Sequence, residues 1–80
     1  MITVKCKAAR TGLLPFIDQT GEFESPKAAI RYFIRKLRRK GEDGNLDWTL
    51  TKPTETGFEF DIIYQNGKVC GSGIIEEVKP

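Results

Sequence analysis

Histidine is absent from this sequence, and cysteine occurs only twice, at Cys6 and Cys70. The usual zinc-ligand sets need more of these residues than the chain contains. Without histidine, the serine and cysteine side chains also lack the base that most often activates a nucleophile. We therefore expect no metal, no cofactor and no enzymatic activity.

Long apolar runs are missing as well. No nonpolar stretch is long enough to cross a bilayer, and the first residues lack the apolar segment of a secretory signal. Two cysteines do not make the dense disulfide framework that is typical of small secreted domains. We expect a cytoplasmic protein with reduced thiols that does not associate with a membrane.

The length and composition set the scale of the fold. Eighty residues suffice for one domain, residues 1–80, built around a single small core. With 39% hydrophobic and 30% charged residues, the chain has the composition of an ordinary folded domain. This composition argues against wholesale disorder.

The first part of the chain predicts a β-hairpin. Apolar and polar residues alternate strictly over residues 2–8, as in a half-buried strand. Residues 10–12 indicate a turn, and residues 13–18 a returning strand in which Pro15 favours an edge position or a bulge. A second turn is predicted at residues 18–21, because Asp-Gln-Thr-Gly is rich in turn-forming residues.

A helix is predicted over residues 27–40. Ser25 can accept a hydrogen bond from a first-turn N–H, and Pro26 suits the first helical position. Gly41 suits the left-handed residue that follows a helix. Between these ends, apolar residues recur at helical spacing and form one stripe that faces the core. The stripe consists of Ala29, Ile30, Phe33, Ile34 and Leu37.

Three further strands are predicted at residues 47–52, 57–64 and 68–78. Asn66-Gly67 between alternating segments is a strong signal for a two-residue hairpin turn, which would place Gln65 opposite Lys68. The predicted architecture is therefore α+β in the order ββαβββ, with the helix packed on one face of an antiparallel sheet.

The predicted hairpin register places Phe60 opposite Gly73 and Ile62 opposite Gly71. We interpret the glycines as gaps that the two large side chains fill, or that allow the helix to approach closely. The alternative interpretation is that the glycines form the floor of a site for a ligand or for the backbone of a partner.

The same register predicts a second, open sheet face. It places three apolar residues on the side away from Phe60 and Ile62, mixed with carboxylates that disfavour a buried second layer. This apolar row could support weak self-association or docking of another protein. Its residues are Ile63, Cys70 and Ile74. Since Cys6 alternates toward the core instead, we expect two free thiols.

Charge is distributed unevenly along the chain. Seven of the thirteen basic residues lie between Lys27 and Lys40, a stretch without any acid. The remainder has six basic and eleven acidic residues, so a net charge of +2 combines a strongly basic segment with a molecule that is otherwise at −5. Such polarity favours an anionic partner.

The helix dipole explains only part of this segment. Cations near the end of a helix are stabilised by the dipole, but Lys27, Arg31 and Arg35 lie at its start and middle. Six pairs of like charges at helical spacing would lower the stability of the fold by about 1–3 kcal/mol. Either the chain's own acids or a partner could offset this cost. The nearby acids are Glu22, Glu24, Glu42 and Asp43.

These patterns predict a non-enzymatic binding module whose partner is nucleic acid, with cations on phosphates and Tyr32 as a stacking residue. The predicted contact residues are Lys27, Arg31, Tyr32, Arg35, Arg38 and Arg39. The alternative is a small protein-interaction module, such as an inhibitor or an antitoxin-like regulator of the kind that phages and plasmids encode, which docks on an acidic protein surface.

Overall fold

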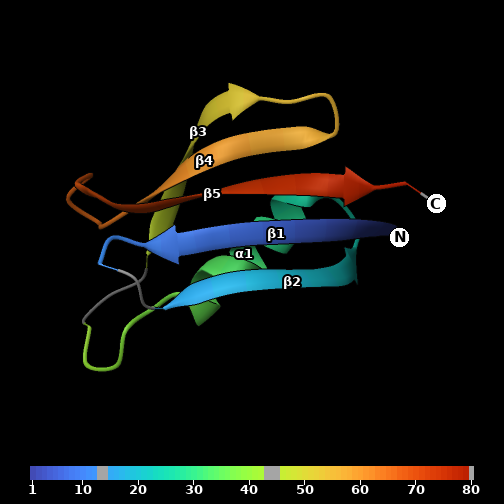
Figure 1. Cartoon of the computed structure of the whole chain (residues 1–80). Coiled ribbons are helices and arrows are strands. Elements are labelled where there is room, and N and C mark those ends of the chain that lie inside the picture. Colours follow the sequence, from blue (N-terminus) through green and yellow to red (C-terminus); the bar gives the residue numbers. More distant parts are fainter. Residues whose placement is uncertain (13–14, 43–45, 80) are drawn as a thin grey trace.

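The computed structural model describes residues 1–12, 15–42 and 46–79. In these residues the chain forms five strands and one helix in the predicted order, and the α+β class is confirmed. The strands are all antiparallel and form one sheet of order β2-β1-β5-β4-β3, with α1 on one face (Figure 1). The elements are β1 (Ile2–Arg10), β2 (Phe16–Phe23), α1 (Pro26–Lys36), β3 (Asp47–Pro53), β4 (Gly57–Ile63) and β5 (Val69–Val78).

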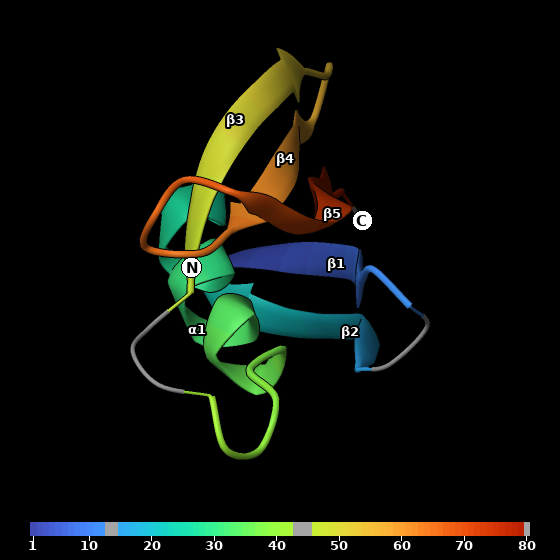
Figure 2. The same cartoon turned by 90° about the vertical axis from the view of Figure 1, so that its left-hand side faces the viewer.

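The first and last strands join the two halves of the sheet. β1 pairs with β2 on one side and with β5 on the other, while β2 and β3 form the two edges. The chain therefore crosses from one edge of the sheet to the other between β2 and β3, and α1 lies on that path. α1 packs on β2, β1 and β5, and the far end of β3 extends beyond the helix (Figure 2).

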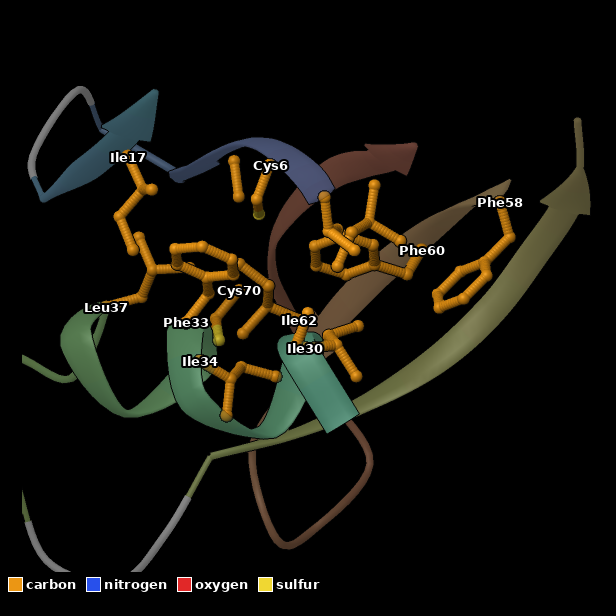
Figure 3. Packing of buried hydrophobic residues seen from close by; sticks show 14 residues of the cluster. Cys6, Ile17, Ile30, Phe33, Ile34, Leu37, Phe58, Phe60, Ile62 and Cys70 are labelled. Atoms are coloured by element: carbon orange, nitrogen blue, oxygen red, sulfur yellow. The ribbon is translucent and has the colours of Figure 1, made fainter. Parts of the chain in front are cut away.

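The start of α1 follows the predicted pattern. The Ser25 hydroxyl accepts a hydrogen bond from the Ala28 N–H at 3.1 Å, and Pro26 occupies the first turn. The predicted apolar stripe is buried between the helix and the sheet (Figure 3). Burying this stripe against the sheet is what stabilises an eleven-residue helix, which would be marginal alone.

The predicted end of the helix is wrong. α1 ends at Lys36 instead of Lys40, and the N–H of Leu37 donates to the Ile34 carbonyl at 3.1 Å. Gly41 does have a positive φ of 87°, but it belongs to a turn beyond the helix. Arg38, Arg39 and Lys40 therefore lie in the loop beyond the helix.

The predicted turn at residues 18–21 is also wrong, because these residues lie within β2. Phe16 to Phe23 pair residue by residue with Ala9 to Ile2 of β1. This continuous ladder outweighs the local turn preference of the Asp-Gln-Thr-Gly sequence. Residues 13 and 14 of the predicted strand lie outside the described part of the chain.

The β4–β5 hairpin differs from its predicted turn in two ways. A longer loop shifts the strand pairing by one residue, and a bulge shifts it back. Tyr64, not Gln65, lies opposite Lys68, because the Tyr64 N–H donates to the Lys68 carbonyl at 2.9 Å. The loop thus has three residues and ends at Gly67, whose φ is +86°. A bulge between Ile62 and Ile63 then shifts the register by one residue.

Beyond this bulge the predicted pairs are confirmed: Ile62 lies opposite Gly71, and Phe60 opposite Gly73. A Cβ atom on Gly73 would lie 2.7 Å from Phe60 Cζ, and one on Gly71 would lie 3.1 Å from Ile62 Cδ1. The large side chains fill both gaps, so the packing interpretation is confirmed and the ligand-floor alternative is wrong.

The bulge changes the placement of Cys70. Ile63 and Ile74 lie half-buried on the sheet face away from α1, as predicted, whereas Cys70 is 5% exposed and belongs to the core. Cys6 points into the same core, and both thiols are free (Figure 3). The strand register separates the two residues by roughly 15 Å, too far for a disulfide. Burial raises the pKa of the Cys6 thiol to about 12.

Candidate functional site

Arg10, the last residue of β1, is the only charged residue that is buried among those the structure describes, with 2% of its surface exposed. It continues the inward alternation of the strand after Cys6 and Ala8. A buried guanidinium is costly unless all its donors are satisfied. The surrounding groups therefore have to be arranged to receive it.

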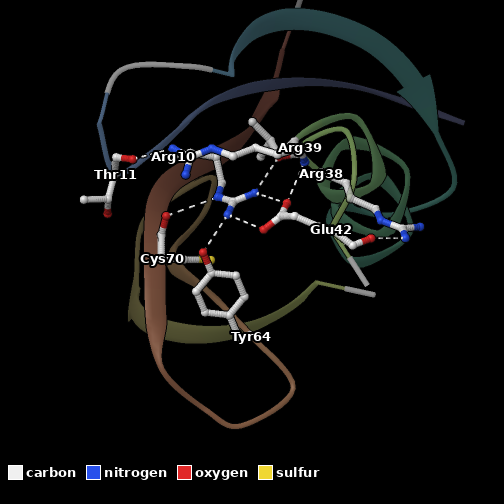
Figure 4. Close-up of polar contacts among 8 residues, drawn as sticks. Arg10, Thr11, Arg38, Arg39, Glu42, Tyr64 and Cys70 are labelled. Atoms are coloured by element: carbon white, nitrogen blue, oxygen red, sulfur yellow. Dashed lines mark hydrogen bonds and ion pairs between the residues drawn. The ribbon is translucent and has the colours of Figure 1, made fainter. Parts of the chain in front are cut away.

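The Arg10 guanidinium bonds to three neutral acceptors from distant parts of the chain (Figure 4). Nη1 donates to the Leu37 carbonyl at 2.9 Å, and Nε to the Cys70 carbonyl at 3.3 Å. Nη2 donates to the Tyr64 hydroxyl at 3.0 Å, and the guanidinium also lies 5.5 Å from the centre of the Tyr64 ring. Arg10 thus ties β1 to the helix end and to the β4–β5 hairpin.

The charge of Arg10 is balanced by Glu42. The carboxylate accepts from Nη1 at 2.8 Å and from Nη2 at 2.9 Å, a bidentate ion pair. The same carboxylate accepts from the Arg39 N–H at 2.6 Å. The bonds from Arg10, and then the one from the Arg39 backbone, lower the pKa of Glu42 to about 2.

This network explains why the helix ends early. The Leu37 carbonyl must face Arg10, and Glu42 must fold back to reach the same guanidinium. The returning chain is held further by Arg38, whose Nη2 donates to the Glu42 carbonyl, and by Arg39, whose Nη2 donates to the Thr11 carbonyl at 2.6 Å. The basic segment is therefore divided between a helix and a folded loop.

The helical part presents a stripe of exposed cations, which we call the basic stripe. Lys27, Arg31 and Arg35 follow one another at four-residue spacing, which keeps them on one flank of α1. Arg38 lies beyond the helix end on the same flank, where it lines a groove together with Arg31 and Arg35. In the described part of the chain, no carboxylate lies within ion-pair distance of these four side chains.

Among the residues that the structure describes, no acid neutralises the basic stripe through an ion pair. Glu42 is the one predicted neutralising acid that forms an ion pair in the described residues, and its partner is Arg10 instead of the helix. Glu22 and Glu24 form no ion pair there either. Asp43 lies outside the described residues.

Tyr32 is not brought together with the arginines. Its side chain is 47% exposed, but its ring packs against Phe23 at the end of β2, with 5.4 Å between ring centres. The Lys36 ammonium lies over the same ring, 4.7 Å from its centre. Tyr32 and Lys36 thus occupy the flank of α1 toward β2, and stacking on Tyr32 would require displacing Lys36.

The flank toward β3 contains a groove that the sequence did not predict. Arg31, Arg35 and Arg38 line one side of it, and its volume is about 540 Å³. The opposite side has a different composition, with two apolar residues and one carboxylate. That side is formed by Leu46, Asp47 and Trp48, and Ile34 of α1 completes the lining.

Trp48 is held in this groove by its neighbours. Its ring stacks on Phe58 with 5.4 Å between centres and an interplanar angle of 18°. Its backbone N–H donates to the Asp47 carboxylate at 2.8 Å. The sequence predicted only a strand residue that packs on the core, and no local signal in the chain places Trp48 beside three arginines.

No helix within the described ranges is both long and apolar enough to cross a membrane. The same residues contain no cluster of three or more side chains that could hold a metal ion. No protein-family model matches the chain, and no curated protein sequence or solved structure is significantly similar to it.

Proposed function

We propose that this protein is a non-enzymatic module that binds nucleic acid through the basic stripe formed by Lys27, Arg31, Arg35 and Arg38. The observation that carries this proposal is that the stripe is exposed and has no carboxylate partner in the described residues. Cations at four-residue spacing advance about 6 Å per step along the helix, an arrangement suited to a row of phosphates.

The repulsion among the basic residues is weaker in the structure than the sequence predicted. Only the Lys27–Arg31 and Arg31–Arg35 pairs lie within α1, so like-charge repulsion costs about 0.4–1 kcal/mol, less than the sequence predicted. The stronger support comes from the contrast with Arg10, whose charge is fully used inside the protein. No carboxylate in the described residues neutralises the charges of the basic stripe, although one Arg38 donor bonds to the Glu42 carbonyl.

A salt titration with a labelled, mixed-sequence oligonucleotide tests the proposal. The logarithm of the binding constant should fall linearly with the logarithm of salt concentration, because phosphate contacts release counterions. Replacing Arg31 and Arg35 together by glutamine should reduce the slope by about 1.4–1.8, at about 0.7–0.9 per contact. Lys5 and Lys7 lie on the opposite sheet face. Replacing both by glutamine removes the same two positive charges and should leave the slope unchanged.

Two results would contradict the proposal. One is the absence of measurable binding at low salt to single-stranded and duplex oligonucleotides. The other is complete displacement of the oligonucleotide by polyglutamate at equal charge concentration, which would identify an acidic protein surface as the better partner.

A further inference from the structure

We infer that the groove between α1 and β3 binds a single nucleic acid strand, with phosphates on the arginines and a base against Trp48. This inference rests on the proposed function and makes it more specific. It assigns to the site a substrate class, single-stranded over duplex nucleic acid, and a base-contacting residue that the sequence did not identify.

The two sides of the groove differ in their chemistry. Arg31, Arg35 and Arg38 provide positive charge on the helix side, whereas Leu46 and Trp48 provide an apolar surface where β3 begins. A duplex presents phosphates outward and keeps its base faces stacked inside, so it can use only the helix side. A single strand exposes both phosphates and base faces, and it can use both sides at once.

Trp48 has the properties of a preorganised base contact. Phe58 stacks on one face of its indole ring and fixes its orientation, and the ring is only partly buried although it packs against the core. Aromatic contacts with bases tolerate any sequence, because every base has a flat π-face. Tyr32 is less suited to this role, since Phe23 and Lys36 already engage its ring.

Asp47 is the one lining residue that opposes this occupant. Its carboxylate adds a negative charge to the groove, but three guanidinium groups outnumber it. Replacing Asp47 by asparagine keeps an oxygen that can accept from the Trp48 N–H and removes the charge. We expect this variant to bind a single strand about 2- to 5-fold more tightly at low salt, where surface charges are least screened.

Trp48 is the only tryptophan of the chain, so its fluorescence reports directly on the groove. The wild-type protein is titrated with a single strand, as DNA and as RNA, and with the duplex of the same sequence. We expect saturable quenching by the single strand and tighter binding of the single strand than of the duplex. Trp48→Ala should weaken single-strand binding by about 5- to 100-fold, and Trp48→Phe by less, because it retains an aromatic face.

The outcomes separate this inference from the function on which it rests. If the duplex binds at least as tightly and Trp48 fluorescence stays constant, the groove assignment is wrong while nucleic acid binding stands. If neither form binds, both proposals fail. If polyglutamate quenches Trp48 as strongly as the single strand does, the occupant is an acidic polypeptide and the inference is overturned. The wild-type titration decides these cases even if the alanine variant does not fold.

Discussion

Arg10 and Arg31 carry the same side chain, but the fold uses them in opposite ways. Arg10 is buried, and its guanidinium is bonded to Glu42, Tyr64 and two backbone carbonyls. Arg31 is exposed and has no carboxylate partner in the described residues. An arginine whose donors are all satisfied within the protein stabilises the fold, whereas one without internal partners can serve a ligand.

The same difference divides the basic segment itself. Lys27, Arg31 and Arg35 lie on the helix and are exposed. Arg38 and Arg39 lie in the loop that folds back on the Arg10–Glu42 pair, and both donate to backbone carbonyls there. A uniform run of charge in the sequence thus becomes an exposed surface on the helix and a structural network at Arg39, while Arg38 contributes to both.

The largest expected effect comes from removing the buried guanidinium. Arg10→Met should lower the free energy of unfolding by about 2–4 kcal/mol, because the Leu37 and Cys70 carbonyls lose their donor and Glu42 loses its charge partner. Urea denaturation followed by circular dichroism measures this change. Lys7→Met is the matched control, since Lys7 is exposed on the same strand and should change stability by less than about 0.5 kcal/mol. Equal stabilities of the two variants would show that the network contributes nothing.

A smaller effect is expected from titrating Glu42. Its pKa is about 2 in the folded protein and lies near 4.5 ordinarily, so the carboxylate stabilises the fold above about pH 5. That contribution should be lost progressively as the pH falls from about 5 to 2, because the proton binds the unfolded chain more readily. The measurement is the difference in Tm between the wild type and Glu42→Gln across this range. The difference should shrink toward acid pH, and a constant difference would contradict the role of the ion pair.

Local signals predicted much of the fold. Ser25 and Pro26 identified the start of α1, and the spacing of Ile30, Phe33 and Ile34 identified its buried face. These features succeed because capping and helical periodicity depend on residues within a few positions of one another. The alternation of β1 and β4 succeeded for the same reason.

The incorrect predictions concern features that depend on contacts between residues far apart in the sequence. The three-residue loop and the bulge of the β4–β5 hairpin compensate each other, so the predicted pairing of Ile62 with Gly71 was right although the turn was wrong. Cys70, the extra residue of this bulge, was consequently placed on the wrong face. The end of α1 was missed because it depends on Arg10, which is 27 positions away from Leu37 in the sequence.

The candidate site was predictable only in part. The exposure of Lys27, Arg31 and Arg35 follows from helical geometry. The groove does not, because it requires knowing that the start of β3 lies beside α1. One signal for Arg10 was present: extending the alternation of β1 by one step places it on the buried face.

The smallest expected effect concerns the stability of the exposed stripe. Arg31→Gln and Arg35→Gln should each change the free energy of unfolding by less than about 0.5 kcal/mol, toward higher stability, because each variant removes a like-charge neighbour in α1. Thermal melts at low and high salt measure this, and any stabilisation should disappear at high salt as screening removes the repulsion. A loss of more than about 1 kcal/mol would mean that these arginines have structural partners, as Arg10 does. Losses of oligonucleotide binding in the same variants could then no longer be attributed to phosphate contacts alone.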